Sequence, residues 1–198
     1  MRGLLSVLMI AAAATTASGQ SIKMALDPTG SIRVDGTSNI HAWHATSTQI
    51  IATIQVASPI AESKVESVTL TLPVTSLKSG KGGLDKNLYK ALNAEKNPTI
   101  TFVMKTYQAT PKGDAYEAVI TGLLTVNGVE KELKAEATMT QDGKGGLKAV
   151  GSAAMKMTDF GVKPVTALMG TIRTGDAITV RFDLTGVAAQ AVAELPRE

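Results

Sequence analysis

Side chains suited to metal or acid–base chemistry are few in this sequence of 198 residues. Its two histidines stand in the segment His41-Ala42-Trp43-His44. Residues three apart on a strand point to opposite faces, so the pair is poorly placed to chelate one ion, and a zinc site would lack a third ligand. The carboxylates stand singly, as at Asp27, Asp35, Asp159 and Asp183. We therefore predict no metal, no cofactor and no catalytic residues, and we do not expect an enzyme.

A glycine-rich segment and the absence of cysteine narrow the chemistry further. Gly80-Lys81-Gly82-Gly83 lacks the Gly-x-x-x-x-Gly-Lys-Ser/Thr spacing of a phosphate-binding loop, so we interpret it as a plain loop. No Gly-x-Ser-x-Gly nucleophile motif occurs. Without cysteine, the chain has no disulfide, thiolate zinc site, iron–sulfur cluster or cysteine nucleophile.

Methionines are the remaining soft ligands. Met155 and Met157 share one face of a predicted strand, and Met139 could lie across from them. Because exported proteins can hold copper(I) through thioethers, a copper-binding module is one alternative. Methionine is also the ordinary flexible filler of irregular apolar space, and we favour that interpretation.

The first nineteen residues have the pattern of a secretory signal. Arg2 precedes an apolar run over 4–14, and small residues end the segment at Ala17-Ser18-Gly19. The run is shorter than the roughly 20 residues that span a bilayer core. We therefore expect a signal peptide over 1–19, a domain over 20–186 and a loose tail over 187–198. The mature protein is expected in the periplasm, without stable membrane insertion.

The composition is that of a globular domain without a nucleic-acid partner. At 44% hydrophobic and 19% charged residues, the chain is too apolar to be disordered. The formal net charge is only +3, and no dense basic run accompanies it, which argues against nucleic-acid binding. The length suits one domain with a core of its own.

Alternating apolar and polar residues predict strands along most of the chain. The runs lie over 42–56, 68–72, 100–104, 116–124, 133–139, 147–157 and 178–184. Asn127-Gly128 predicts a tight hairpin between two runs, because both residues tolerate positive φ. Leu84, Leu88 and Leu92 share a helical face and predict one short helix that must pack on the strands.

About eight antiparallel strands with one apolar face each need a sandwich or a closed barrel. A meander of hairpins closes a barrel without long crossovers and leaves no exposed edges, so we predict an all-β barrel. The presumed inner face carries small residues such as Ala135, Ala149 and Ala153, and aromatic residues are only 4% of the chain. The residues alone leave two alternatives: a hollow barrel that holds one ligand, or a solid-cored barrel that acts through its outer surface.

Four segments resemble, in family order, the YceI-like family of exported lipid- or polyisoprenoid-binding proteins. They are 34–43 with its Gly-Thr-Ser-x-x-His-x-Trp pattern, 84–92 followed by Asn-Pro-Thr-Ile-Thr-Phe over 97–102, the Gly-x-Leu-Thr-x-x-Gly-Val type of hairpin over 122–129, and 157–164 followed by Thr-Gly-Asp over 174–176. The segment from Leu84 departs from the Arg-Asp-x-His-Leu of the better-known branch, so the identity of the ligand is not carried over.

The resemblance implies an extended, lipocalin-like antiparallel β-barrel of about eight strands with one or two short helices. It also implies that the lumen holds a long isoprenoid or other lipid chain, which the protein would sequester or transport. The helix around Leu88 and the loop over 160–169 would cover one end, and the sequence leaves a homodimer open. The residues expected to line the lumen are Phe102, Met104, Tyr116, Ile120, Leu124, Ala137, Met139, Ala153, Met155 and Phe182.

Overall fold

The computed structural model describes residues 21–58, 60, 63–167 and 170–188. Within them lie one α-helix, α1 (Gly82–Ala91), and two short 3-10 turns, η2 (Val74–Ser76) and η3 (Met157–Phe160). The strands are β1 (Ser21–Leu26), β2 (Ser31–Ser38), β3 (Ala42–Ser47), β4 (Ile51–Ala57), β5 (Val65–Pro73), β6 (Thr99–Lys112), β7 (Ala115–Val126), β8 (Val129–Gln141), β9 (Leu147–Lys156), β10 (Thr166–Ala167) and β11 (Ile172–Ala188).

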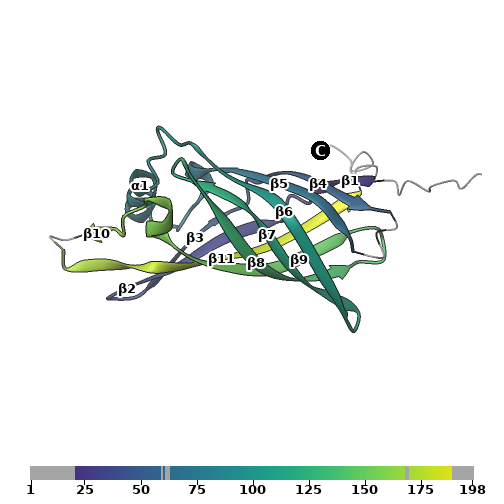
Figure 1. Ribbon diagram of the computed structural model, residues 1–198. Helices are drawn as coiled ribbons and strands as arrows, with labels where there is room; N and C mark the ends of the chain where they lie inside the picture. Colours follow the sequence, from purple (N-terminus) through teal and green to yellow (C-terminus); the bar gives the residue numbers. More distant parts are fainter. Residues whose placement is uncertain (1–20, 59, 61–62, 168–169, 189–198) are drawn as a thin grey trace, which may run out of the picture.

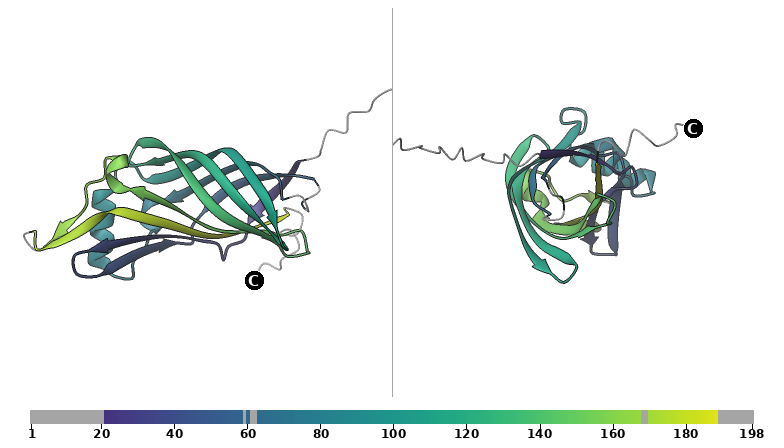
Figure 2. Two further views of the ribbon diagram at one scale, coloured as in Figure 1. Left: turned by 60° about the horizontal axis from the view of Figure 1, so that its bottom comes forward. Right: turned by 90° about the vertical axis from the view of Figure 1, so that its right-hand side faces the viewer.

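These strands form one closed, eight-stranded antiparallel barrel, which confirms the predicted fold class. Neighbours pair in the order β1-β4-β5-β6-β7-β8-β9-β11, and β1 closes the ring by pairing with β11. β1 and β2 share one strand position, as do β3 and β4, because β1 pairs with β4 and β2 with β3. Figure 2 shows the strands surrounding the barrel axis in its right-hand view.

The period-2 pattern explains which side chains face inward. On β8 the buried Ala135, Ala137 and Met139 alternate with exposed Lys134 and Glu136, which form an ion pair on the outside. One face of the strand is therefore apolar and the other is charged.

Tight turns join the strands where the sequence predicts them. Asn127 and Gly128 have φ values of 52° and 75°, and they connect β7 to β8 as the Asn-Gly hairpin requires. A register shift between Met104 and Thr106 marks a bulge in β6 at Lys105.

The two ends of the barrel differ. At one end, which we call the mouth end, lie α1, η2, η3, β10 and the β2–β3 turn (Figure 1). At the opposite, closed end lie the β4–β5, β6–β7 and β8–β9 connections, together with the start of β1 and the end of β11. Each end has its own cluster of buried apolar residues. In the described part of the chain, no helix has both the length and the apolar character needed to span a bilayer.

Three predicted boundaries need adjustment. The run over 42–56 is two strands, because the side chain of Ser47 accepts a hydrogen bond from the Gln49 N–H (3.1 Å) and bonds the Ser76 hydroxyl (2.7 Å), which turns the chain. The run over 147–157 ends at Lys156, where η3 begins. β11 continues through Ala188, two residues into the predicted tail. The predicted signal peptide and residues 189–198 lie outside the described residues.

Candidate functional site: an apolar cavity along the barrel

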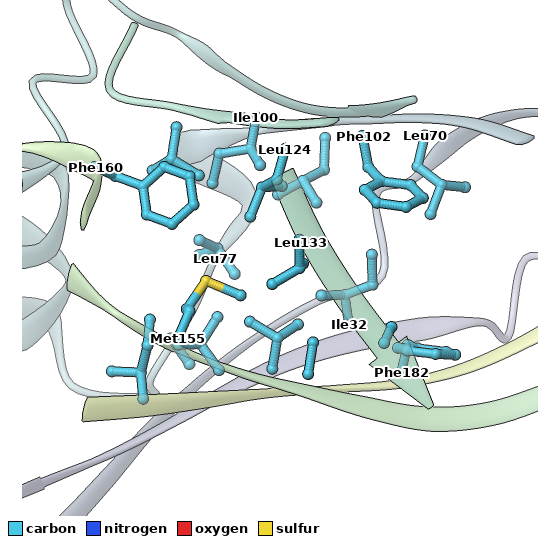
Figure 3. A pocket seen from close by; sticks show the side chains of 18 of the residues that line it. Ile32, Leu70, Leu77, Ile100, Phe102, Leu124, Leu133, Met155, Phe160 and Phe182 are labelled. Atoms are coloured by element: carbon cyan, nitrogen blue, oxygen red, sulfur yellow. The ribbon is translucent and has the colours of Figure 1, made fainter. Parts of the chain in front are cut away.

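A cavity of about 530 Å³ runs inside the barrel and is lined by residues from nearly all of its strands and from α1. This volume falls within the roughly 300–1,000 Å³ of typical ligand pockets. Every side-chain atom drawn in the close-up is carbon or sulfur (Figure 3). The solid-cored alternative therefore does not describe this barrel.

Inward-facing side chains keep accessible surface because they border the cavity. Leu70, Phe102, Leu133, Met155 and Phe182 all point inward, yet each is only partly buried. A filled barrel would bury such side chains completely, since protein interiors pack to near-crystalline density. Alternation along each strand supplies the lining, and small residues among it leave the space.

Three aromatic side chains cover glycines of the neighbouring strand on the inner wall. The pairs are Trp43 on Gly36, Phe102 on Gly122 and Phe182 on Gly151. A Cβ added at Gly151 would lie 2.5 Å from Phe182 Cζ and 2.3 Å from the backbone oxygen of Glu136. Since no side chain fits there, the glycines let the rings lie against the wall instead of crossing the lumen.

The cavity opens at the mouth end. Among its lining residues that the structure describes, three are classed as exposed, namely His41, Lys81 and Asn87. Ser38 and Thr174, which pair across β2 and β11, also line it there. The opening is therefore polar, while the deeper lining is almost wholly apolar.

At the closed end, Ile60 and Ser63 of the β4–β5 connection are hydrogen-bonded to the barrel. Tyr107 lines the cavity and donates a hydrogen bond to the Ser63 carbonyl (2.7 Å), and the Gln141 amide donates to the Ser63 hydroxyl (2.9 Å) and the Ile60 carbonyl (3.0 Å). Burial, together with the nearby Tyr116, raises the pKa of Tyr107 to about 12. This hydroxyl therefore stays neutral and acts as an anchor.

Helix α1 is fastened to the rim of the opening. The Asp85 carboxylate accepts hydrogen bonds from the N–H (2.8 Å) and hydroxyl (2.5 Å) of Ser79, and these bonds lower the pKa of Asp85. The Tyr89 hydroxyl lies 2.8 Å from the Leu77 carbonyl oxygen and accepts a bond from Lys78 Nζ, also at 2.8 Å. With its two ends held, α1 presents Leu84 and Leu88 to the cavity.

The turn η3 is fastened beside α1. The Asp176 carboxylate accepts hydrogen bonds from the Thr158 N–H (2.9 Å) and hydroxyl (2.7 Å), which lower the pKa of Asp176. The Asn127 amide donates to the Phe160 carbonyl (3.2 Å) and accepts from Asn97 (3.3 Å). Phe160 is thereby held buried in the cavity lining.

These contacts join segments that are distant in sequence. The four segments singled out above meet at the mouth end, through the Asn97–Asn127–Phe160 chain of hydrogen bonds and the Thr158–Asp176 pair. Gly175 lies against the segment over 34–43, since a Cβ there would come within 2.6 Å of the Thr37 hydroxyl.

Eight of the ten residues predicted to line the lumen border the cavity. They are Phe102, Met104, Ile120, Leu124, Met139, Ala153, Met155 and Phe182. The other two, Tyr116 and Ala137, do not. Tyr116 faces inward but packs in the closed-end cluster, and Ala137 is buried in the same cluster, against which Phe182 packs. Whether the eight contact a ligand remains a prediction.

Sequence reasoning missed Tyr107. The alternation of Ile100, Phe102 and Met104 would continue inward at Thr106, whereas the bulge at Lys105 reverses the order and turns Tyr107 inward. No sequence signal at Lys105 marks this bulge. The loop over 160–169 lines the cavity through Phe160, Val162 and Val165, while residues 168–169 lie outside the described part.

The two histidines do not face a common site, as the prediction that their side chains point to opposite faces requires. His41 and Trp43 line the cavity at its opening, whereas His44 is exposed and does not border it. Among the described residues, no three or more histidine, aspartate or glutamate side chains lie close enough together to hold a metal ion. Met139, Met155 and Met157 all border the apolar cavity.

Sequence comparison places the chain among known proteins. A model of the YceI-like domain matches residues 14–186. A UPF0312 protein of Pseudomonas aeruginosa is 37% identical over 105 residues, which are 50% of this chain and 53% of that protein. One from Azotobacter vinelandii is 33% identical over 110 residues, 52% and 56% of the two chains. The chain thus spans about half the length of the curated relatives it matches.

Solved structures share the fold. BcnA of Burkholderia cenocepacia superposes with a TM-score of 0.64 at 19% identity, over 81% of this chain and 98% of that one. A polyisoprenoid-binding domain from Saccharophagus degradans gives 0.62 at 10% identity, over 84% and 99%. At these identities the likeness establishes the barrel fold alone. Because the family model covers nearly the whole barrel, the chain belongs to the YceI-like domain family.

Proposed function

We propose that this protein is an exported carrier that sequesters or transports a long isoprenoid or other lipid chain in the barrel. The observation that carries the proposal is an apolar cavity with a polar opening at one end. A polar ligand deep in such a lining would lose its bonds to water without replacement, at a cost of roughly 2–7 kcal/mol per group. A hydrocarbon chain instead gains about 0.8 kcal/mol for each methylene buried.

The shape of the cavity favours an elongated chain. β11 alone contributes lining residues from Ile172 to Gly186. At about 3.3 Å per residue and the usual strand tilt of roughly 35–45°, these span about 35 Å along the barrel. The hydrocarbon core of a whole bilayer is about 30 Å thick, so this lining extends further than the chain of a lipid in one leaflet. This length favours a polyisoprenoid over an ordinary fatty acid.

The polar opening gives the ligand an orientation. His41, Lys81, Asn87, Ser38 and Thr174 surround the end of the cavity that meets solvent. We infer that the chain enters tail first and that its polar group stays among these side chains. The closed end, where Tyr107 is bonded to the Ser63 carbonyl, would then limit the length of chain that fits.

The relatives support the chemical class of the ligand. The Saccharophagus degradans neighbour is described as a polyisoprenoid-binding domain, and it shares this fold. The pattern over residues 1–19 supports export, which would place the carrier in the periplasm. N-terminal sequencing of protein from a periplasmic fraction tests this, and a start at Gln20 is expected. Full-length protein recovered from the cytoplasm would contradict it.

Native mass spectrometry tests the ligand. Protein purified gently from its own host is weighed intact, and its organic extract is analysed in parallel. A stoichiometric added mass that extracts as a long isoprenoid or lipid is the expected result. A bare polypeptide mass, together with no uptake of added polyprenols or fatty acids, would refute the carrier function.

A further inference from the structure

The connections at the mouth end carry an excess of positive charge. Over 74–98 and 157–167 there are six lysines and three acidic residues: Lys78, Lys81, Lys86, Lys90, Lys96 and Lys163 against Asp85, Glu95 and Asp159. At the closed end, the described connections balance Lys64 and Lys144 against Asp114 and Asp142. The barrel is therefore electrostatically polar along its axis.

The six lysines at the mouth end are free of carboxylate partners. All six are exposed, and within the described residues none lies within 4.0 Å of a carboxylate oxygen. Four lysines on the strands, by contrast, form ion pairs: Lys105, Lys112, Lys134 and Lys148. The acidic Asp85 is already occupied by Ser79. Apart from Lys78, which donates a hydrogen bond to the Tyr89 hydroxyl, these lysines are therefore available to a partner.

Two features show which surface at the mouth end would face a partner. On α1, Lys86 and Lys90 are exposed one turn apart, while Leu84 and Leu88 face the cavity. At the β2–β3 turn, Ile40 is 59% exposed and directly precedes His41, which lines the opening. An exposed apolar residue and a set of lysines at the same end of a molecule are the combination that binds the interface of an anionic bilayer.

The described chain begins and ends at the closed end. Ser21 starts β1 and Ala188 ends β11, and Met24 pairs with Ala188 at the closed end (Figure 1). Both ends of the described chain therefore lie at the end opposite the opening.

We propose that the mouth end docks on an anionic phospholipid surface, with Lys81, Lys86 and Lys90 against the headgroups and Ile40 inserted among them. The opening would then face the membrane, so that a lipid chain passes between bilayer and cavity without crossing water. The purpose of docking rests on the proposed carrier function, whereas docking itself rests on the charges and on Ile40. A second copy of this chain fits the face less well, because like charges would meet.

Vesicle flotation tests the proposal. The probe is a vesicle of equal parts phosphatidylcholine and phosphatidylglycerol, free of isoprenoids, and the reference is phosphatidylcholine alone. Wild-type protein should float with the anionic vesicles and lose binding as salt is raised. The double variant Lys86→Glu/Lys90→Glu should lower the partition constant by at least about 30-fold, from roughly fivefold for each lysine near the surface.

The matched control is Lys23→Glu/Lys144→Glu, which makes the same change in net charge at exposed positions of the closed end. It should retain most of the binding, whereas Ile40→Asp should lose it without changing the thermal melting of the barrel. Equal binding to the two vesicle types, equal losses in both double variants, or no flotation at all would overturn the proposal. A wild-type dimer in sedimentation that Lys86→Glu/Lys90→Glu converts to monomer would assign the face to a second copy instead.

The carrier function and the docking surface can be tested independently. Titration of a polyprenol in dilute detergent measures the cavity without a bilayer, and isoprenoid-free vesicles measure docking without cargo. Flotation without polyprenol binding would support the docking surface and refute the carrier function. Polyprenol binding without flotation would support the carrier function and refute the docking surface.

Discussion

Ala153 faces the cavity from β9, while its neighbour Ala154 is exposed on the outside of the same strand. We expect Ala153→Phe to weaken chain binding by roughly tenfold or more, because the ring takes space that would otherwise bury at least two methylenes. The matched control Ala154→Phe adds the same ring outside and should bind normally. Fluorescent fatty-acid displacement measures both. Equal affinities in the two variants would contradict the assignment of the inner face.

Gly151 shows how tightly the Phe182 ring packs against the inner wall of the barrel. A Cβ there would meet both the Glu136 backbone oxygen at 2.3 Å and the Phe182 ring at 2.5 Å. We therefore expect Gly151→Ala to destabilise the barrel by about 1–3 kcal/mol in urea unfolding. Gly83→Ala is the control, since nothing lies within 4 Å of its added Cβ, and it should change the free energy of unfolding by less than about 1 kcal/mol.

Residue-level prediction succeeded where the strands are regular and failed where they are not. The alternation on β9 predicts that Ala153 and Met155 face inward, and both border the cavity. Tyr107 is missed because a bulge has no signature in composition, and Ala137 is misplaced because periodicity gives the face of a strand and not what covers it. Tertiary packing decides both.

Carboxylates hold the elements at the opening, and this makes the opening sensitive to acid. The pKa values of Asp85 and Asp176 are lowered by hydrogen bonds from Ser79 and Thr158. Their contribution to stability is therefore complete above the ordinary value of 3.8 and is lost as the pH falls through their lower folded values. We expect the melting temperature to fall over this range of pH.

The variant Asp85→Asn/Asp176→Asn should reduce that acid dependence, because two of the groups that titrate are gone. It should also melt somewhat earlier at neutral pH, since an amide accepts these bonds more weakly. Glu95→Gln removes another exposed carboxylate of the same end and serves as control. An unchanged slope of melting temperature against pH in the double variant would show that other groups cause the acid effect.

At the level of helices, strands and turns, short sequence patterns are enough to predict most elements. The leucine spacing gives α1, and Asn127-Gly128 gives the β7–β8 turn. The division between β3 and β4 depends instead on Ser47 meeting Ser76, a hydroxyl on a distant segment. Such a contact exists only once the barrel has formed, so the pattern over 42–56 alone predicts one strand.

The whole barrel should respond to cargo as a single unit. A ligand that binds only the folded state adds about 2.7 kcal/mol of stability at a hundredfold excess over its Kd, which corresponds to roughly 5–10 °C in Tm for a domain of this size. We expect polyprenol to produce this shift in wild type and little shift in Ala153→Phe. Differential scanning calorimetry measures it. Two transitions, of which only one moves, would show that the mouth end and the closed end unfold independently.

For the whole molecule, the sequence predicts the class of fold but not which strands pair to close the barrel. Period-2 runs and short turns require a barrel or a sandwich, and the YceI-like resemblance selects the barrel. That Met24 pairs with Ala188, so that β1 joins β11, follows from no local pattern. The cavity likewise depends on the diameter of the closed ring, which individual strands do not specify.

Trp43 is the only tryptophan of the chain, and it lies at the opening of the cavity with its indole N–H donated to the Thr37 carbonyl (3.1 Å). All indole fluorescence of the protein therefore originates at the entrance. A chain that passes this ring exchanges water for hydrocarbon around it, which should shift the emission to shorter wavelength as the cavity fills. The barrel thus carries its own optical reporter of occupancy, and loading and release can be followed in real time without a label.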